Sequence, residues 1–269
     1  MSETTTLLRT ERLSVRYGGV AANSDIDITV GAGEIVGLIG PNGAGKTTFV
    51  DAVTGFTDAT GHVTLEGVAL DRFGPHRRRR AGLARTWQAG ELFGDLTVKQ
   101  NLAVALQRTG LRSLLTDIVG RSAPPGETIE AALDLVGVPG VGGFRPTELT
   151  LGQQKLVGVA RALVGGSRVV LLDEPAAGLD THESTEFGQH LRRIAASGIG
   201  VLLIDHDMQL VLDICARLYV LDFGVVIASG EPARIREDPR VITAYLGTAA
   251  HGEDARPPAT ADRPAGENE

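Results

Sequence analysis

Short apolar runs alternate with amphipathic segments through the second half of the chain. From residue 149 the pattern predicts a helix to Leu163, the strand RVVLLD, the helix HESTEFGQHLRRIAASG, the strand GVLLID, the helix MQLVLDICARL and the strand YVLDFG. Apolar runs placed between helices are typical of buried parallel strands. The alternation therefore predicts an α/β fold with a mostly parallel sheet covered by helices on both faces.

The first 88 residues contain more predicted strand than helix. TLLRTERLSVRY, DIDITV and EIVGLIG have strand-like patterns, and GAG at 31–33 marks a turn between the last two. TTFVDAVTGF, which follows Lys46, has a helical pattern. GHVTLEGVAL predicts two further strands around Gly67.

The character of the chain changes between residues 89 and 148. LTVKQNLAVALQRTG and ETIEAALDLVGV predict helices, which APPG at 123–126 and PGVGG at 139–143 interrupt. From residue 249 the sequence has no apolar pattern, so we expect a disordered tail. We therefore divide the chain into a core of residues 1–88 and 149–248, an inserted helical part of residues 89–148, and a tail of residues 249–269.

Composition places the chain among ordinary globular proteins and limits its partners. Of 269 residues, 42% are hydrophobic and 22% charged. The 26 basic and 33 acidic residues give a net charge of −7, which argues against a nucleic-acid partner. The N-terminus lacks the pattern of a signal peptide, and no apolar run approaches the ~18 residues typical of a membrane span. We therefore expect a cytoplasmic protein that serves a membrane only through partners.

Three local features have structural interpretations. Cys215, the single cysteine, excludes an intramolecular disulfide, and its apolar surroundings favour a core position over a nucleophile. The run Arg77–Arg80, beside the helix-compatible AGLAR, is interpreted as a solvated helix face. Asp222-Phe223-Gly224 matches a kinase tripeptide, but without a kinase catalytic loop before it we expect a turn at the end of a strand.

The segment GPNGAGKT at residues 40–47 is the strongest chemical signal. It fits G-x-x-x-x-G-K-[ST], follows the strand EIVGLI and begins a helix, which is the context that a phosphate-binding P-loop requires. Glycines let backbone N–H groups surround phosphates, and the helix N-terminus adds partial positive charge. Lys46 would reach the β- and γ-phosphates and Thr47 would bind Mg²⁺. The candidate nucleotide-binding residues here are Asn42, Gly43, Ala44, Gly45, Lys46, Thr47 and Thr48.

Two carboxylates follow the apolar strand RVVLL. Asp173 would bind Mg²⁺, in part through water, because this ion keeps much of its hydration shell. Glu174 would face the γ-phosphate and orient the attacking water as general base. An apolar strand that ends in two acids is common, but together with the P-loop it predicts nucleotide hydrolysis.

LTLGQQ, at residues 149–154, has two interpretations. Thr150 and Gln153 have the spacing of a capping box, in which two side chains and two backbone amides at a helix N-terminus pair reciprocally. Gly-Gln-Gln on the first turn also leaves open backbone that could contact an anionic ligand. The loop either caps its helix only, or caps it and touches a ligand.

The order of these motifs resembles the nucleotide-binding subunit of an ABC transporter. P-loop, Gln88 after ARTW, LTLGQQ, VVLLDEP, GLD and IDHD occur in sequence, and the resemblance covers about residues 7–247. It implies an ATPase domain over residues 1–248 that uses ATP and Mg²⁺. It also implies a P-loop NTPase core with a mostly parallel sheet, an N-terminal antiparallel β subdomain and an inserted α-helical subdomain.

The resemblance assigns roles to residues outside the P-loop. Tyr17 would stack on adenine, although a surface tyrosine at the end of a strand is an alternative. Gln88 would contact Mg²⁺ and the attacking water, and relay occupancy of the site to the helical part. Asp180 would link the two sites of a dimer, and His206 would contact the γ-phosphate.

The same resemblance implies a second chain. Thr150, Gly152 and Gln153 would lie in the signature loop, which in this family meets ATP held by the other subunit of a head-to-tail dimer. That subunit is either an identical chain or a paralogue. Dimer closure would drive a separate integral-membrane permease, docked on the helical part, from the inner face of the cell membrane.

Finer features resemble the ATPases of branched-chain amino-acid importers. These features are ARTWQ, DEPAAGLD, the closing VITAYLG, and Leu151 where the signature usually has glycine. An importer would also use a substrate-binding protein. The alternatives are a urea, amide or lipid transporter ATPase, a non-transport ABC ATPase of DNA repair or translation, and a nucleotide-binding regulator without turnover.

Overall fold

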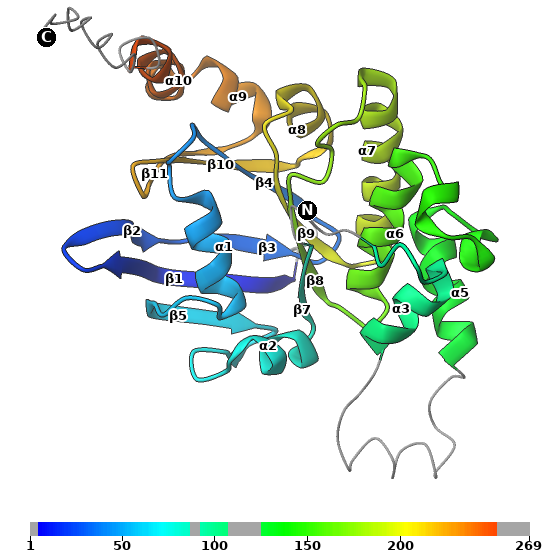
Figure 1. Cartoon of the computed structure of the whole chain (residues 1–269). Coiled ribbons are helices and arrows are strands. Elements are labelled where there is room, and N and C mark those ends of the chain that lie inside the picture. Colours follow the sequence, from blue (N-terminus) through cyan, green and yellow to red (C-terminus); the bar gives the residue numbers. More distant parts are fainter. Residues whose placement is uncertain (1–4, 87–91, 107–124, 252–269) are drawn as a thin grey trace, which may run out of the picture.

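The computed structural model describes residues 5–86, 92–106 and 125–251. Within them, two sheets and a group of helices form the fold (Figure 1). The predicted α/β class is confirmed, including the antiparallel N-terminal sheet and the helical insertion.

The antiparallel sheet has the order β2-β1-β5-β6, with β3 paired to the other part of β1. DIDITV was predicted as one strand, and this prediction is wrong. The segment is divided between two short strands, β2 and β3, which pair with different parts of the long strand β1. Ile26 pairs with Leu13, whereas Thr29 pairs with Arg9. The strands are β1 (Thr6–Tyr17), β2 (Val20–Ile26), β3 (Thr29–Gly31), β5 (Thr60–Leu65) and β6 (Val68–Ala69).

The second sheet has the order β11-β10-β4-β9-β8-β7 and is parallel except for β11. Its central strands β4, β8 and β9 are buried at every residue, as continuous apolar runs require. The strands are β4 (Ile35–Ile39), β7 (Leu83–Arg85), β8 (Val169–Asp173), β9 (Gly200–Ile204), β10 (Arg217–Asp222) and β11 (Val225–Gly230).

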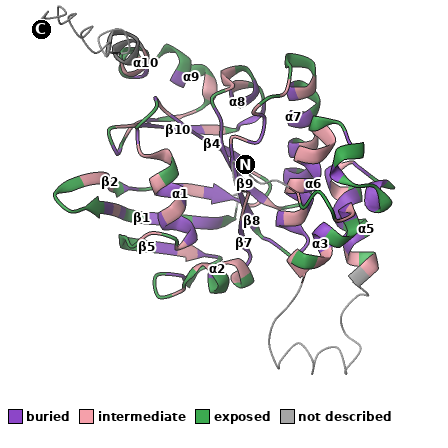
Figure 2. Cartoon of the chain, in the orientation of Figure 1, coloured by how far each residue is buried: buried purple, intermediate pink, exposed green. Residues whose placement is uncertain are grey.

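Helices cover both faces of the parallel sheet. Phe49 of α1 belongs to a core that also contains the antiparallel sheet, whereas Leu133 of α5 and Phe187 of α7 belong to a second core. Figure 2 shows buried positions along the strands of both sheets and along the helices beside them. The helices are α1 (Lys46–Thr54), α2 (Pro75–Ala81), α3 (Val98–Leu106), α5 (Pro125–Val136), α6 (Leu151–Leu163), α7 (Thr181–Ala196), α8 (Met208–Ile214), α9 (Pro232–Glu237) and α10 (Pro239–His251), with 3₁₀ turns η1 (Val141–Gly143) and η2 (Pro146–Glu148).

Several predicted boundaries change. AGLAR, interpreted as helix-compatible, contains strand β7, because backbone pairing with β8 outweighs local helix preference. The helix predicted over MQLVLDICARL ends at Ile214, and Arg217 already belongs to β10. Helix α10 extends to His251, into the segment predicted to be a tail, and residues 252–269 lie outside the described residues.

The interpretation of Arg77–Arg80 as a solvated helix face is wrong for Arg78. Its side chain is buried, and its guanidinium donates to the carbonyls of Ala52 and Val53 at 2.8 and 2.7 Å, and to that of Phe73 at 2.8 Å. Ala52 and Val53 lie in the last turn of α1, whose carbonyls lack helical partners. Arg78 therefore caps α1 from a different helix.

We expect Arg78→Ala to lower the free energy of unfolding by about 2 kcal/mol, because it leaves buried carbonyls without a charged donor. Arg80 is exposed on the same helix, so Arg80→Ala should change this quantity by less than about 0.5 kcal/mol. Urea unfolding monitored by circular dichroism measures both. Equal destabilisation by the two variants would contradict the capping role.

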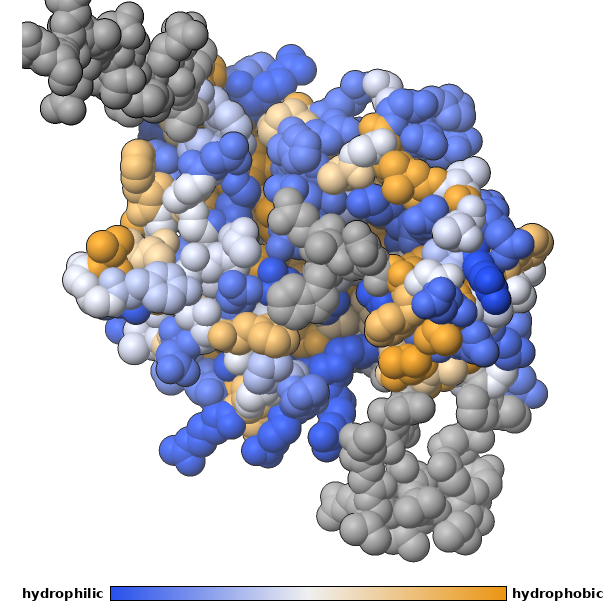
Figure 3. Space-filling view, viewed as in Figure 1, coloured by the Kyte–Doolittle hydropathy of each residue, from blue (hydrophilic) through white to orange (hydrophobic). Residues whose placement is uncertain are grey.

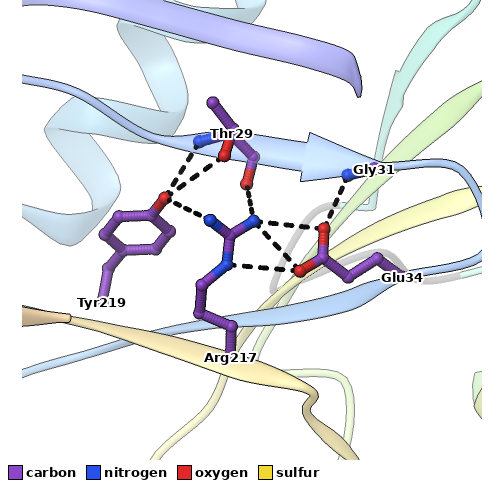
Figure 4. A network of polar contacts seen from close by, with 5 residues as sticks. All are labelled: Thr29, Gly31, Glu34, Arg217 and Tyr219. Atoms are coloured by element: carbon purple, nitrogen blue, oxygen red, sulfur yellow. Dashed lines mark hydrogen bonds and ion pairs between the residues drawn. The ribbon is translucent and has the colours of Figure 1, made fainter. Parts of the chain in front are cut away.

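A polar network fastens the two sheets together (Figure 4). Arg217 of β10 donates to the Glu34 carboxylate at 3.0 Å and to the Thr29 carbonyl of β3 at 3.1 Å. Glu34 also accepts from the Gly31 amide at 2.8 Å, and the Tyr219 hydroxyl accepts from Arg217 at 3.1 Å. The network fixes the turn that leads into β4, the strand before the P-loop.

Cys215 is confirmed as a core residue, since it is 6% exposed. Burial raises the pKa of its thiol to about 12. Only the thiolate reacts with alkylating agents, so we expect no labelling of the folded chain by iodoacetamide at about pH 8. Labelling should become complete in guanidinium chloride. Mass spectrometry measures both, and rapid modification of the folded chain would contradict the buried position.

Candidate functional site

The P-loop connects β4 to α1, as the sequence predicted. Gly40, Gly43 and Gly45 have φ values of 150°, 81° and 98°, which side chains rarely permit. A Cβ atom at residue 40 would lie 2.0 Å from the Leu221 carbonyl oxygen. Gly45 is the N-cap of α1 and offers no side-chain cap, so the first amides of this helix face an anion-binding position.

Lys46 lies folded against the P-loop itself. Its Nζ donates to the carbonyls of Gly40 and Pro41 at 2.6 and 2.9 Å. Burial lowers the pKa of Lys46, and the negative charges of Glu174 and Asp173 oppose that change. The lysine and both predicted carboxylates are therefore brought together.

The other P-loop candidates differ in accessibility. Asn42, Gly43 and Thr47 are exposed, and Thr48 is half-buried, so all four can be reached from solvent. Ala44 is buried and contributes only its backbone, with its amide bonded to the Pro41 carbonyl at 3.2 Å.

Asp173 is buried at the end of β8 and lies in an ion-pair bridge. Arg85, at the end of β7, donates to its Oδ2 at 3.0 Å and also pairs with Asp51 of α1. Burial raises the pKa of Asp173, and the hydrogen bond from Arg85 opposes that rise. Sequence reasoning missed Arg85, although its place three residues before Gln88 was the available signal.

Glu174 is half-buried and has a strained backbone. Its φ of 48° is left-handed, and its amide donates to the Ile204 carbonyl of β9 at 2.7 Å. Such a conformation in a residue other than glycine costs about 1–3 kcal/mol and persists when neighbouring structure enforces it. Because Arg12, Asp25 and Glu66 have the same φ outside the site, the role proposed for Glu174 rests on its place beside Asp173 and Lys46.

His206 follows β9, the strand beside β8, and is largely exposed. Its Nδ1 lies 3.8 Å from the Asp205 carboxylate. Asp205 is buried and accepts from the amides of Ala176 and Asp207 at 3.1 and 3.0 Å. The sequence did not single out Asp205, which joins the loops that carry Glu174 and His206.

The donors fit Mg²⁺ only together with a nucleotide. Thr47 offers a hydroxyl and Asp173 a carboxylate, and magnesium prefers such oxygen ligands. In the part of the chain that the structure describes, no three His, Cys, Asp or Glu side chains form a metal-binding group. Phosphate oxygens and water would have to complete the coordination.

The capping box at Thr150 is confirmed. The Gln153 amide donates to the Thr150 hydroxyl at 3.2 Å, and the Thr150 amide donates to Gln153 Oε1 at 3.0 Å. Gly152 is partly exposed, and a Cβ atom there would meet nothing within 4 Å. The first turn of α6 is therefore capped and also open to an approaching ligand.

The remaining predicted residues lie at the edges of elements. Asp180 caps α7 in a second capping box, where its Oδ1 accepts from the Glu183 amide at 2.9 Å. Tyr17 ends β1, is 54% exposed, and its hydroxyl lies 3.3 Å from Thr57 Oγ1. Gln88 lies outside the described residues.

A cavity of about 620 Å³ opens between this site and the helical part. Asp173 and Glu174 of the site belong to its lining. Its lining also includes the apolar residues Leu92, Phe93 and Val104 and the cations Arg79, Lys155 and Arg161.

Comparison with known proteins agrees with this geometry. Residues 23–177 match the family described as ABC transporter, and residues 225–251 match the family described as branched-chain amino acid ATP-binding cassette transporter. Over 251 residues the chain is 37% identical to the high-affinity branched-chain amino acid transport ATP-binding protein LivG of Escherichia coli (strain K12), covering 90% of this chain and 98% of that protein.

Two further relatives match the chain over a similar share of its length. The lipopolysaccharide export system ATP-binding protein LptB of Haemophilus influenzae is 33% identical over 245 residues, which cover 90% of this chain and 97% of LptB. A solved ATP-binding cassette of an ABC transporter, in its ADP conformation, matches with a TM-score of 0.79 and 30% identity over 91% of this chain and 100% of its own. The chain therefore belongs to the ABC transporter family as an ATP-binding cassette, the ATPase that this family couples to transport.

Proposed function

We propose that this ATPase drives an importer of branched-chain or other amino acids. The observation that carries the proposal is the match of residues 225–251 to a family described by that cargo. The match covers all of β11, α9 and α10, beyond the region shared with ABC transporters in general. Identity of 37% to LivG, against 33% to LptB, favours amino acids over lipid.

Within one chain, the P-loop and the carboxylates would perform distinct tasks. The amides at the start of α1 and Lys46 would bind the phosphates, and Tyr17 would stack on adenine. Thr47 and Asp173, together with Gln88, would hold Mg²⁺, which supplies charge stabilisation when bound. Glu174 would accept a proton from the attacking water, and His206 would contact the γ-phosphate.

A second chain, identical or paralogous, would complete each site. Thr150, Gly152 and Gln153 of one chain would meet the γ-phosphate held by the other, and Asp180 would connect the two sites. Support comes from the open first turn of α6, where Gly152 leaves room for close backbone approach.

The permease would dock on the cavity beside the helical part. Phe93 and Val104 line it and are 54% and 47% exposed, and Figure 3 shows hydrophobic surface gathered over this region. Among the described residues, no helix is long and apolar enough to span a membrane. In this proposal a permease and a substrate-binding protein supply the transport path, and the ATPase acts on the permease from the inner face of the cell membrane.

Reconstitution with the cognate permease and binding protein in liposomes tests this proposal. We expect leucine or a related amino acid to stimulate ATP hydrolysis, and Phe93→Asp to abolish that stimulation while basal hydrolysis persists. Phe144→Asp is the matched control, because Phe144 is 48% exposed and does not line the cavity. Stimulation by urea or lipid in place of amino acids would overturn the cargo assignment.

A further inference from the structure

The end of the P-loop contacts a residue that lies in none of the motifs identified in the sequence. Asn23 of β2 is fully buried, and its Nδ2 donates to the Gly45 carbonyl at 3.1 Å. Gly45 is the residue before Lys46 and the N-cap of α1. The Gly45 carbonyl and the Lys46 amide belong to the same peptide group. Asn23 therefore contacts the peptide that carries the first amide of α1, where the phosphates would bind.

The orientation of this amide follows from its partner. A carbonyl oxygen only accepts, so the Nδ2 group must face Gly45. In the described part of the chain, Asn23 Oδ1 is buried without a hydrogen-bond partner. An unpaired buried oxygen costs stability, and an apolar side chain of similar size would remove that cost. Stability alone therefore does not explain an asparagine at this position.

The turn between β10 and β11 holds the preceding peptide. The Gly224 amide donates to the Ala44 carbonyl at 2.9 Å, and the Gly224 carbonyl accepts from the Ser24 amide of β2 at 2.8 Å. Asp222-Phe223-Gly224 is thus the strand-ending turn that the sequence predicted, but it also bridges β2 to the P-loop.

These three segments pack backbone against backbone. A Cβ atom at residue 45 would lie 2.6 Å from the Ala22 carbonyl oxygen, and one at residue 224 would lie 2.5 Å from it. Gly224 has a φ of 78°. There is no room for a side chain at either glycine, so any change at residue 224 must shift β2, the turn or the P-loop.

We propose that Asn23 and Gly224 are positioning residues that hold the Gly45–Lys46 and Ala44–Gly45 peptides, respectively, in the orientation that binds the phosphates of ATP. The proposal rests on the proposed role of the P-loop. Neither residue belongs to the P-loop, so both would act through its backbone carbonyls. Helix α1 keeps its own hydrogen bond from the Phe49 amide to the Gly45 carbonyl at 2.9 Å. Loss of the contacts from Asn23 and Gly224 would therefore alter the conformation of the loop and leave the helix intact.

Binding of ADP by calorimetry tests the proposal on Asn23→Leu and Gly224→Ala. We expect the Kd to rise about tenfold for each, equivalent to about 1.4 kcal/mol. Gly67→Ala is the matched control, because Gly67 also has a φ of 78° but a Cβ atom there meets nothing within 4 Å. It carries the same backbone strain and should bind ADP like the wild type.

Thermal unfolding and steady-state kinetics separate positioning from general damage. For Asn23→Leu we expect a Tm without nucleotide at or above that of the wild type. We also expect an ATP KM about tenfold higher and a kcat within about twofold. An unchanged Kd for ADP in both variants would overturn the positioning role, whether or not the Tm fell. If the wild type itself failed to bind ADP, the proposed role of the P-loop would be wrong, and the positioning role would be wrong as a consequence.

Discussion

Replacing Glu174 with glutamine is expected to lower ATP turnover by about 100-fold or more and to leave ATP binding intact. General base catalysis contributes about 10²–10⁴-fold, and glutamine keeps the size of the side chain but cannot accept the proton. Glu174 lies at the end of β8 with a left-handed φ of 48°, close enough to Lys46 to influence its pKa. The measurement is phosphate release at saturating ATP, with Kd for ATP measured in parallel.

Glu186→Gln is the control for this experiment. Glu186 is an exposed acid on α7, and we expect its replacement to leave turnover within about twofold of the wild type. Turnover by Glu174→Gln at the wild-type rate would remove this residue from the mechanism. Absence of turnover in the wild type, even with its permease, would favour a regulator that binds nucleotide without hydrolysis.

Gly152→Asp is expected to fold, to bind ATP and to hydrolyse it at least about 100-fold more slowly than the wild type. A Cβ atom at residue 152 meets nothing within 4 Å, and an acid in the first turn of α6 is compatible with the helix dipole. In the proposed dimer, however, the new carboxylate would lie against the γ-phosphate held by the other chain. Like charges in a site that excludes water repel strongly.

The control places the same charge outside α6 and away from the cavity. Gly143 of η1 is exposed, does not line the cavity and has open space around its Cα atom, so Gly143→Asp should fold and retain turnover. If Gly152→Asp hydrolysed ATP like the wild type, LTLGQQ would be a helix cap only. The confirmed capping box would then account for Thr150 and Gln153 completely.

Local chemistry made much of the site predictable from sequence. The P-loop pattern requires glycines because side chains rarely permit a positive φ. Gly40, Gly43 and Gly45 all have a positive φ in the structure, and a Cβ atom at residue 40 or 45 would also collide with backbone. Asp173 was predictable because a buried apolar strand must end at the sheet edge where ligands bind. The capping box of Thr150 and Gln153 depends only on residues three apart.

Contacts between distant segments were not predictable. Arg85 joins Asp51 and Asp173, which lie 34 and 88 residues away from it in sequence. Arg78 is buried because the last turn of α1 reaches it, whereas its neighbours in the arginine run gave no sign of the difference. Asn23 belongs to no motif, and only the fold places it behind Gly45.

The central claim is that two chains share each ATP site, and association of Glu174→Gln tests it most directly. Light scattering with MgATP should show a dimer of this variant, since ATP binds without turnover, and a monomer without nucleotide. The double variant Glu174→Gln with Gly152→Asp should bind ATP and stay monomeric. A double variant that dimerises with MgATP as well as Glu174→Gln would contradict the shared site.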